Sequence, residues 1–106
     1  MLEVTDAGFA DQVLDAGRPV VVDFWAPWCG PCKAVEKALD ELEAEHGDRV
    51  GFVKVNVDEH PERAAELGVL SLPTVILFDE GGPQATVVGP RRRKHFEQTF
   101  ADWLAG

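Results

Sequence analysis

Residues 20–33, which read VVVDFWAPWCGPCK, decide how the rest of the chain folds. The run Val20–Trp25 is short, apolar and rich in β-branched residues, which is typical of a strand buried on both faces. From Cys32 to His46 the apolar residues recur at helical spacing, and Gly47 provides a natural stop. A buried strand therefore passes into a helix, and two cysteines lie at the junction.

Further strand and helix patterns flank this stretch. Residues 6–16 are predicted to form a helix that Asp6 caps and Gly17 ends. Alternating residues predict a strand over 50–57, and Pro83 suits the beginning of an edge strand. The other predicted elements are a helix over 61–67, strands over 74–78 and 85–88 joined at a Gly-Gly turn, and a helix over 94–104. This order indicates an α/β fold, a mixed sheet with helices on both faces, in which the strands flanking the 32–46 helix run parallel.

The composition is that of one globular domain spanning residues 1–106. Hydrophobic residues make up 45% of the chain, which is enough for a real core, and charged residues make up 27%. The net charge of −9 argues against nucleic-acid binding. No apolar run could span a bilayer, and the N-terminus shows no signal-peptide pattern, so we expect a cytoplasmic protein, a monomer with no membrane contact.

Basic residues are unevenly distributed, because Arg91, Arg92, Arg93 and Lys94 are consecutive. Arg92 falls at the expected N-cap of the last helix, where serine or another capping residue would serve better, and arginines there oppose the helix dipole. One hypothesis is that residues 91–94 form a basic rim that steers acidic partners. The alternative is a solvated charge run that offsets the acidic surface nearby.

The two cysteines, Cys29 and Cys32, lie at the beginning of the predicted helix, a position that favours the thiolate form of a redox-active cysteine. The first turn of a helix offers free N–H groups and partial positive charge, which stabilise a thiolate. Cys29 is therefore expected to be more acidic than a free cysteine and to be the attacking nucleophile. Cys32 lies about one turn further on and is suited to resolve a mixed disulfide. Pro31 is tolerated in a first turn and stiffens the loop between the sulfurs.

Three other interpretations of the cysteines compete with redox chemistry. Zinc needs four ligands, but there is no second cysteine pair, and His46, His60 and His95 show no ligand spacing. A purely structural disulfide would close too short a loop to stabilise the fold much. Inert core thiols are common but rarely lie at a strand-to-helix turn. No metal site is expected.

The stretch 22–33 closely resembles the thioredoxin signature. Residues 53–58 (VKVNVD), residues 70–74 (LSLPT) and Gly89 resemble three further landmarks of that family, in the right order and spacing. The resemblance covers the whole chain and implies the thioredoxin fold, with a mixed central sheet of about five strands flanked by four helices. It also implies a protein-disulfide reductase that acts on oxidised proteins and is reduced again by a flavin-dependent, NADPH-fed thioredoxin reductase. The chain has no nucleotide-binding G-x-G-x-x-G, so we expect no cofactor beyond the redox-active disulfide.

Two charged residues are candidates for supporting the exchange. Asp23 is an acid in an apolar strand, where burial favours the neutral form. It is either a strand-end acid that reaches solvent or a proton acceptor for Cys32, and the resemblance favours the second, with water linking the two groups. Lys54 could be an ordinary solvated side chain, but the resemblance implies that its ammonium lies near Asp23 and tunes that acid.

Other site residues are expected to bind substrate. The resemblance implies a cis peptide bond before Pro73, which lets the Leu72 backbone pair with an extended substrate strand. Trp28, Val69, Leu72 and Gly89 are expected to form a flat apolar docking patch, although Trp28 could be simple packing and Gly89 a simple turn residue. Trp25 is interpreted as packing beneath the active-site loop.

The chain departs from the family pattern at Lys37, where thioredoxins often have a proline that kinks the helix. Gly30 and Pro31 between the cysteines argue against a thiol oxidase or isomerase of the same fold, which usually has histidine there. A non-catalytic assembly factor that binds partners through the apolar patch is the second alternative. Replacing both cysteines with serine separates that alternative from a reductase.

Overall fold

The computed structural model describes residues 1–106, and its central strand is β2 (Val20–Trp25). The sheet has five strands in the order β1-β3-β2-β4-β5. Its other strands are β1 (Leu2–Glu3), β3 (Gly51–Asn56), β4 (Thr74–Asp79) and β5 (Gly82–Val88). Strand β2 is parallel to β3 and antiparallel to β4, so the sheet is mixed as predicted. Strand β5 lies at the edge of the sheet and pairs only with β4. An edge strand tolerates Pro83, which has no backbone N–H to donate.

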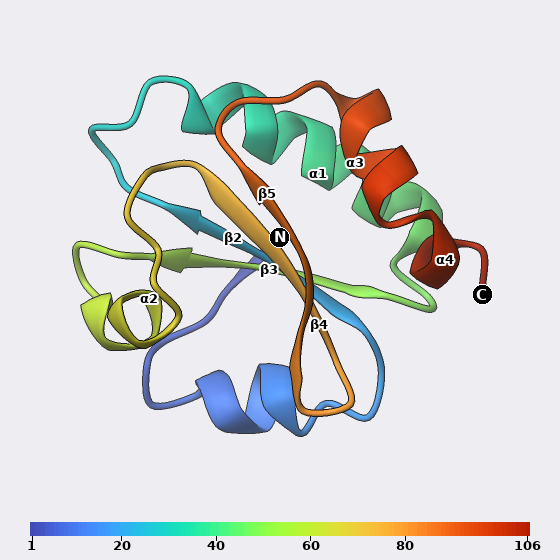
Figure 1. The fold of residues 1–106 in the computed structure, drawn as a ribbon, viewed down its shortest axis with the longest axis horizontal. Helices are drawn as coiled ribbons and strands as arrows, with labels where there is room; N and C mark the ends of the chain where they lie inside the picture. The colour runs from blue at the N-terminus through green and yellow to red at the C-terminus, as the bar shows by residue number, and fades with distance from the viewer.

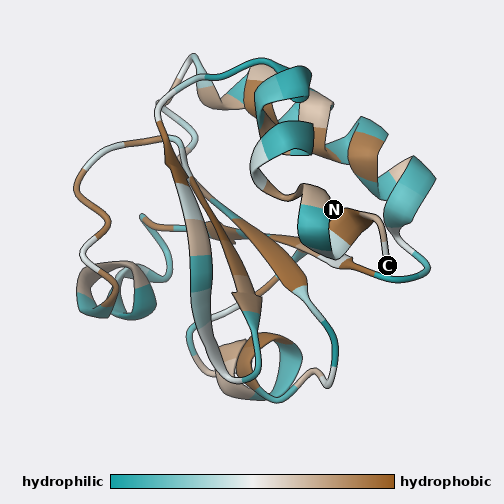
Figure 2. Ribbon diagram, turned by 45° about the vertical axis from the view of Figure 1, so that its right-hand side comes forward, coloured by the Kyte–Doolittle hydropathy of each residue, from teal (hydrophilic) through white to brown (hydrophobic).

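Helices cover both faces of the sheet (Figure 1). The helices α1 (Cys32–His46), α3 (Arg93–Thr99) and α4 (Ala101–Leu104) pack on one face. The π-helix η1 (Ala10–Leu14) and α2 (Pro61–Glu66) lie on the other. Much of the sheet is apolar, and the helices carry both hydrophobic and hydrophilic residues (Figure 2). The core consists of two apolar layers separated by the sheet.

The alternation of side chains along β2 feeds both layers. Val20, Val22 and Phe24 belong to the layer under η1 and α2, whereas Val21 belongs to the layer under α1. Because successive strand residues point to opposite faces, Asp23 shares the α1 face with Val21. The two-residue alternation of side chains along β2 therefore places the Asp23 carboxyl in the core, as it does the neighbouring valines.

The structure differs from the predicted elements in four places. Strand β5 begins at Gly82, in the predicted Gly-Gly turn, and not at residue 85. The helix predicted over 6–16 is only the short η1, preceded by turns, and the one predicted over 94–104 is divided into α3 and α4 at Phe100. The N–H of Phe100 still donates to Phe96, so this division is a bend and not a loop. Strand β1 was not predicted, because two residues are too few to show alternation. The helix over 32–46 is confirmed as continuous through Lys37.

The sequence suggested that Asp6 caps the helix that follows it, but in the structure Asp6 caps α2. Its two carboxylate oxygens accept hydrogen bonds from the backbone N–H groups of Glu62 at 3.1 Å and Arg63 at 3.0 Å. The turn that precedes η1 is instead held by Thr5, whose hydroxyl accepts from the N–H of Gly8 at 3.0 Å. Asp6 therefore connects two segments more than 50 residues apart in the chain.

We predict that Asp6→Ala lowers the free energy of unfolding by about 1 kcal/mol, the usual cost of losing an N-cap. Urea denaturation measures this difference, with Asp11→Ala on exposed η1 as the matched control. Equal stability of the two variants would contradict this capping role.

Candidate active site

The two cysteines form a disulfide at the junction between β2 and α1. Their Cα atoms are 5.5 Å apart, and both side chains are buried. The N–H of Cys32, the first residue of α1, donates to the carbonyl of Cys29 at 3.3 Å, so a helical turn connects the pair. No side chain caps this end of α1, so the sulfurs lie at its first turn without a competing cap.

Sheet register brings Pro73 and Gly89 to this same edge. Phe24 near the end of β2 pairs with Thr74 at the beginning of β4, and Thr74 pairs with Val88 at the end of β5. The Leu72–Pro73 peptide bond is cis, as predicted. The N–H of Gly89 donates to the Pro73 carbonyl at 2.8 Å, and Gly89 has φ 90°, a conformation that favours glycine. The segments at Pro73 and Gly89 therefore lie at the same end of the sheet as the disulfide.

Trp28 lies beside the disulfide and is held by a residue that sequence reasoning missed. Its indole is 70% exposed, and its Nε1–H donates to the Asp58 carboxylate at 3.1 Å. Asp58 is in turn fixed by buried Asn56, whose amide oxygen accepts the Asp58 N–H at 3.0 Å. The signal in the sequence is the Asn-x-Asp arrangement at the end of β3, which is typical of a side-chain-supported turn.

Apolar side chains gather around this edge. Leu70 is 96% exposed and was not among the predicted docking residues, and Val88 is also exposed. Val69 and Leu72 are half-buried against the core. Val69, Leu70 and Val88 line one open groove of about 300 Å³. Exposed side chains of this size are typical of a surface that meets other proteins.

Asp23 is fully buried on the α1 face of β2, and neither of its oxygens has a hydrogen-bond partner. Burial raises the pKa of Asp23 to about 7, with the negative charge of Glu36 acting in the same direction and the Lys54 ammonium opposing it. The carboxyl is therefore poised to gain or lose a proton near neutral pH.

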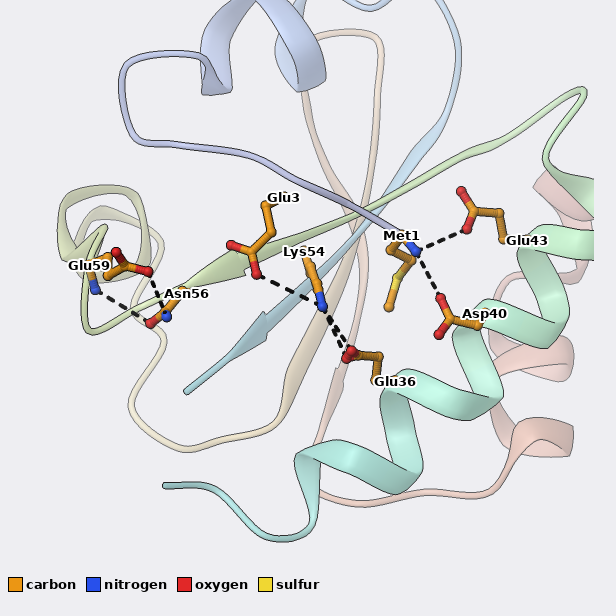
Figure 3. A network of polar contacts seen from close by, with 8 residues as sticks. All are labelled: Met1, Glu3, Glu36, Asp40, Glu43, Lys54, Asn56 and Glu59. Atoms are coloured by element: carbon orange, nitrogen blue, oxygen red, sulfur yellow. Dashed lines mark hydrogen bonds and ion pairs between the residues drawn. The ribbon is translucent and has the colours of Figure 1, made fainter. Parts of the chain in front are cut away.

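Lys54 is the neighbour of Asp23 on β3, but its ammonium binds elsewhere (Figure 3). Nζ donates to the Glu36 oxygens at 2.9 and 3.2 Å and lies 3.9 Å from Glu3. It also lies 5.1 Å from the centroid of the Trp25 ring. Glu36 was missed by sequence reasoning, although its place four residues after Cys32 puts it on the same side of α1 as that cysteine.

The basic run 91–94 divides into two parts. Arg93 forms salt bridges: its guanidinium pairs with Glu41 and Glu97 at 3.5 Å and with Glu45. It thus joins α3 to α1, which accounts for arginine at this position. Arg92 is the N-cap of α3 and makes no capping bond, as the sequence indicated. Arg91, Arg92 and Lys94 are exposed.

The described residues contain no cluster of three or more His, Cys, Asp or Glu side chains that could hold a metal ion. No helix combines the length and apolarity needed to cross a membrane.

A disulfide that closes so short a loop adds little stability, so its place at the first turn of α1 is explained by chemistry and not by stapling. The chain is a thiol–disulfide oxidoreductase. The family model for thioredoxin matches residues 1–102, and the chain belongs to the thioredoxin family.

Known relatives agree with this assignment. The chain is 50% identical over 86 residues to thioredoxin 1 of Synechococcus elongatus, covering 81% of this chain and 80% of the relative. It is 42% identical over 103 residues to a thioredoxin of Alicyclobacillus acidocaldarius, covering 97% of each. It is also 44% identical over 101 residues to the bifunctional thioredoxin reductase/thioredoxin of Mycobacterium leprae, covering 95% of this chain and 22% of that protein.

We predict that Asp23→Asn stabilises the protein at alkaline pH but not at acidic pH. The folded-state pKa lies above the ordinary value of 3.8, so between about pH 4 and about pH 7 the carboxyl is ionised only in the unfolded chain. Stability therefore falls as the pH rises through that window. At about pH 8 the gain is at most about 4 kcal/mol, at about 1.4 kcal/mol per pKa unit.

Urea denaturation at several pH values tests this prediction, with Asp11→Asn on the exposed face of η1 as the control. A gain that persists below about pH 4, or is absent above about pH 7, would contradict the assigned protonation behaviour.

Proposed function

We propose that this chain reduces protein disulfides with Cys29 as the attacking thiolate and Cys32 as the resolving thiol. The observation that carries the proposal is the disulfide between these two residues at the beginning of α1, the helix that covers the face of β2 on which the buried acid Asp23 lies. The helix N-terminus stabilises negative charge on sulfur, which favours the thiolate over the thiol.

The exchange proceeds in two steps with electrons and protons balanced. In the first step the Cys29 thiolate attacks a substrate disulfide, forms a mixed disulfide and releases one substrate thiolate, which takes a proton from solvent. In the second step the Cys32 thiol gives its proton to Asp23, and its sulfur attacks the Cys29 sulfur. The second substrate sulfur leaves and is protonated. The substrate gains two electrons and two protons, and the Cys29–Cys32 disulfide remains.

The residues around the pair have supporting roles in this proposal. Trp28, Val69 and Leu72 contact the substrate through apolar surface, and the backbone beside cis-Pro73 and Gly89 pairs with an extended substrate segment. Gly30 and Pro31 set the geometry of the loop between the sulfurs, and Lys54 adjusts the charge near Asp23. The exposure of Trp28 and the shared edge of these loops support this arrangement.

The partner that returns electrons is inferred to be a thioredoxin reductase. The relative from Mycobacterium leprae, whose name combines the two activities in one protein, supports this inference. We also infer that residues 1–106 form one domain, because both core layers share one sheet. The proposed protein is a monomer that acts in the cytoplasm, where thiols are kept reduced.

The function is tested by reduction of insulin with dithiothreitol or with reductase and NADPH. Cys29→Ser and the double serine variant are expected to lose activity. Cys32→Ser is expected to accumulate a mixed disulfide with insulin through Cys29, because it can attack but not resolve. Mass spectrometry before and after excess dithiothreitol detects that complex. A wild-type protein that reduces insulin no faster than the background would contradict a reductase, and partner binding that survives the double substitution would favour a binding module.

The exposed arginines 91 and 92 are predicted to speed reductase encounter. Both follow Gly89 closely in sequence, so their charges border the proposed docking surface. The double variant Arg91→Gln/Arg92→Gln should lower reductase turnover severalfold at low ionic strength, with the difference fading as salt rises. NADPH consumption measures the rate, and Arg93→Gln, whose charge faces α1, serves as the control. A salt-independent effect, or an equal effect of the control, would remove the steering role.

A further inference from the structure

Helix α1 brings a second carboxyl to the only cation beside Asp23. Lys54 donates to both oxygens of Glu36, and the partly exposed pair lies between α1 and β3 (Figure 3). The same hydrogen bond raises the pKa of Lys54, so the lysine stays protonated. The ammonium also lies over the ring of Trp25, so three contacts from three elements fix its position: Glu36 from α1, Trp25 from β2 and Glu3 from β1.

Asp23 has no such partner. It pairs in register with Lys54 on the neighbouring strand, and both side chains lie on the α1 face of the sheet. Adjacent strands are about 4.8 Å apart, so an ammonium on Lys54 is within reach of this carboxyl unless another group holds it. Both Asp23 oxygens nevertheless remain without a hydrogen bond, while the lysine gives its hydrogen bonds to Glu36.

A cavity of about 250 Å³ joins this pair to the sulfurs. Glu36 and Lys54 line it together with Trp25, Cys29 and Cys32. The lining is half hydrophobic, and the charged Glu36–Lys54 pair supplies hydrogen-bonding partners that a water molecule in this space would need. The Glu36–Lys54 pair therefore lies at the wall of an open space that also reaches both sulfurs.

We propose that Glu36 is a positioning residue for the proton step: by binding the Lys54 ammonium it prevents that cation from pairing with Asp23. The buried carboxyl then stays free to take up the Cys32 proton. This inference rests on the proposed function, because it refines how Asp23 serves the second step of exchange.

The charged groups around Asp23 define what the test should change. Lys54 faces it from β3, Glu36 and Asp40 from α1, and Glu3 lies beyond Lys54 on β1. The β4 residue paired with Asp23 is Val75, which carries no charge. Replacing Glu36 with glutamine removes a negative charge and releases the ammonium, and both changes favour an ionised Asp23.

The test is a ¹³C NMR titration of the Asp23 carboxyl in the oxidised, full-length protein. Glu36→Gln should lower the midpoint by about one pH unit or more. The acidic limb of the pH profile for single-turnover oxidation by insulin should move the same way. In a Lys54→Met background the shift caused by Glu36→Gln should be smaller, because only the direct field of Glu36 remains.

Glu41→Gln is the matched control, since Glu41 is on the same helix but pairs with Arg93. It should leave the Asp23 midpoint unchanged. An unchanged midpoint in Glu36→Gln would overturn the inference, and an equal shift with and without Lys54 would overturn the part assigned to the lysine. These outcomes are separate from the proposed function, which fails only if the wild-type protein does not reduce insulin.

Discussion

The burial of one carboxyl without a hydrogen-bond partner is the constraint on which the rest of the site depends. A buried, unpaired acid costs several kcal/mol when it is ionised, about the size of a large mutational effect. Asp23 bears this cost on β2, the central strand of the sheet, on the face that α1 covers. Stability alone would favour an apolar residue there, and an acid that can take up a proton fits the proposed role of Asp23 as proton acceptor for Cys32.

The fold delivers this arrangement through strand register. Because β2 is parallel to β3 and antiparallel to β4, its carboxyl end meets the beginning of β4 and the end of β5. The cysteine loop, cis-Pro73 and Gly89 thus lie at one edge, while Asp23 and Lys54 share the face beneath α1. One helix then does two things, because α1 presents its first turn to the sulfurs and Glu36 to the lysine.

Most of the strands and helices and the cysteine site could be predicted from the sequence. The features that could not be predicted are mostly contacts between residues distant in the chain. The strands around β2 and the helix from Cys32 have clear periods, and the cysteine pair has a clear position. The capping of α2 by Asp6, the ion pair of Lys54 with Glu36 and the engagement of Arg93 by α1 glutamates join residues distant in the chain. Local pattern carries no information on such contacts. Strand β1 and the bend at Phe100 are too short or too subtle to leave a period.

The most direct measurement starts from a mixed disulfide between Cys29 and a chromogenic thiol. The rate at which Cys32 releases that thiol is compared between the wild-type protein and Asp23→Asn. If Asp23 accepts the Cys32 proton, the variant resolves the mixed disulfide at least about tenfold more slowly at neutral pH, while the preceding attack by Cys29 is less affected. Equal resolution rates in the two proteins would contradict the account, because the buried acid would then have no part in the exchange.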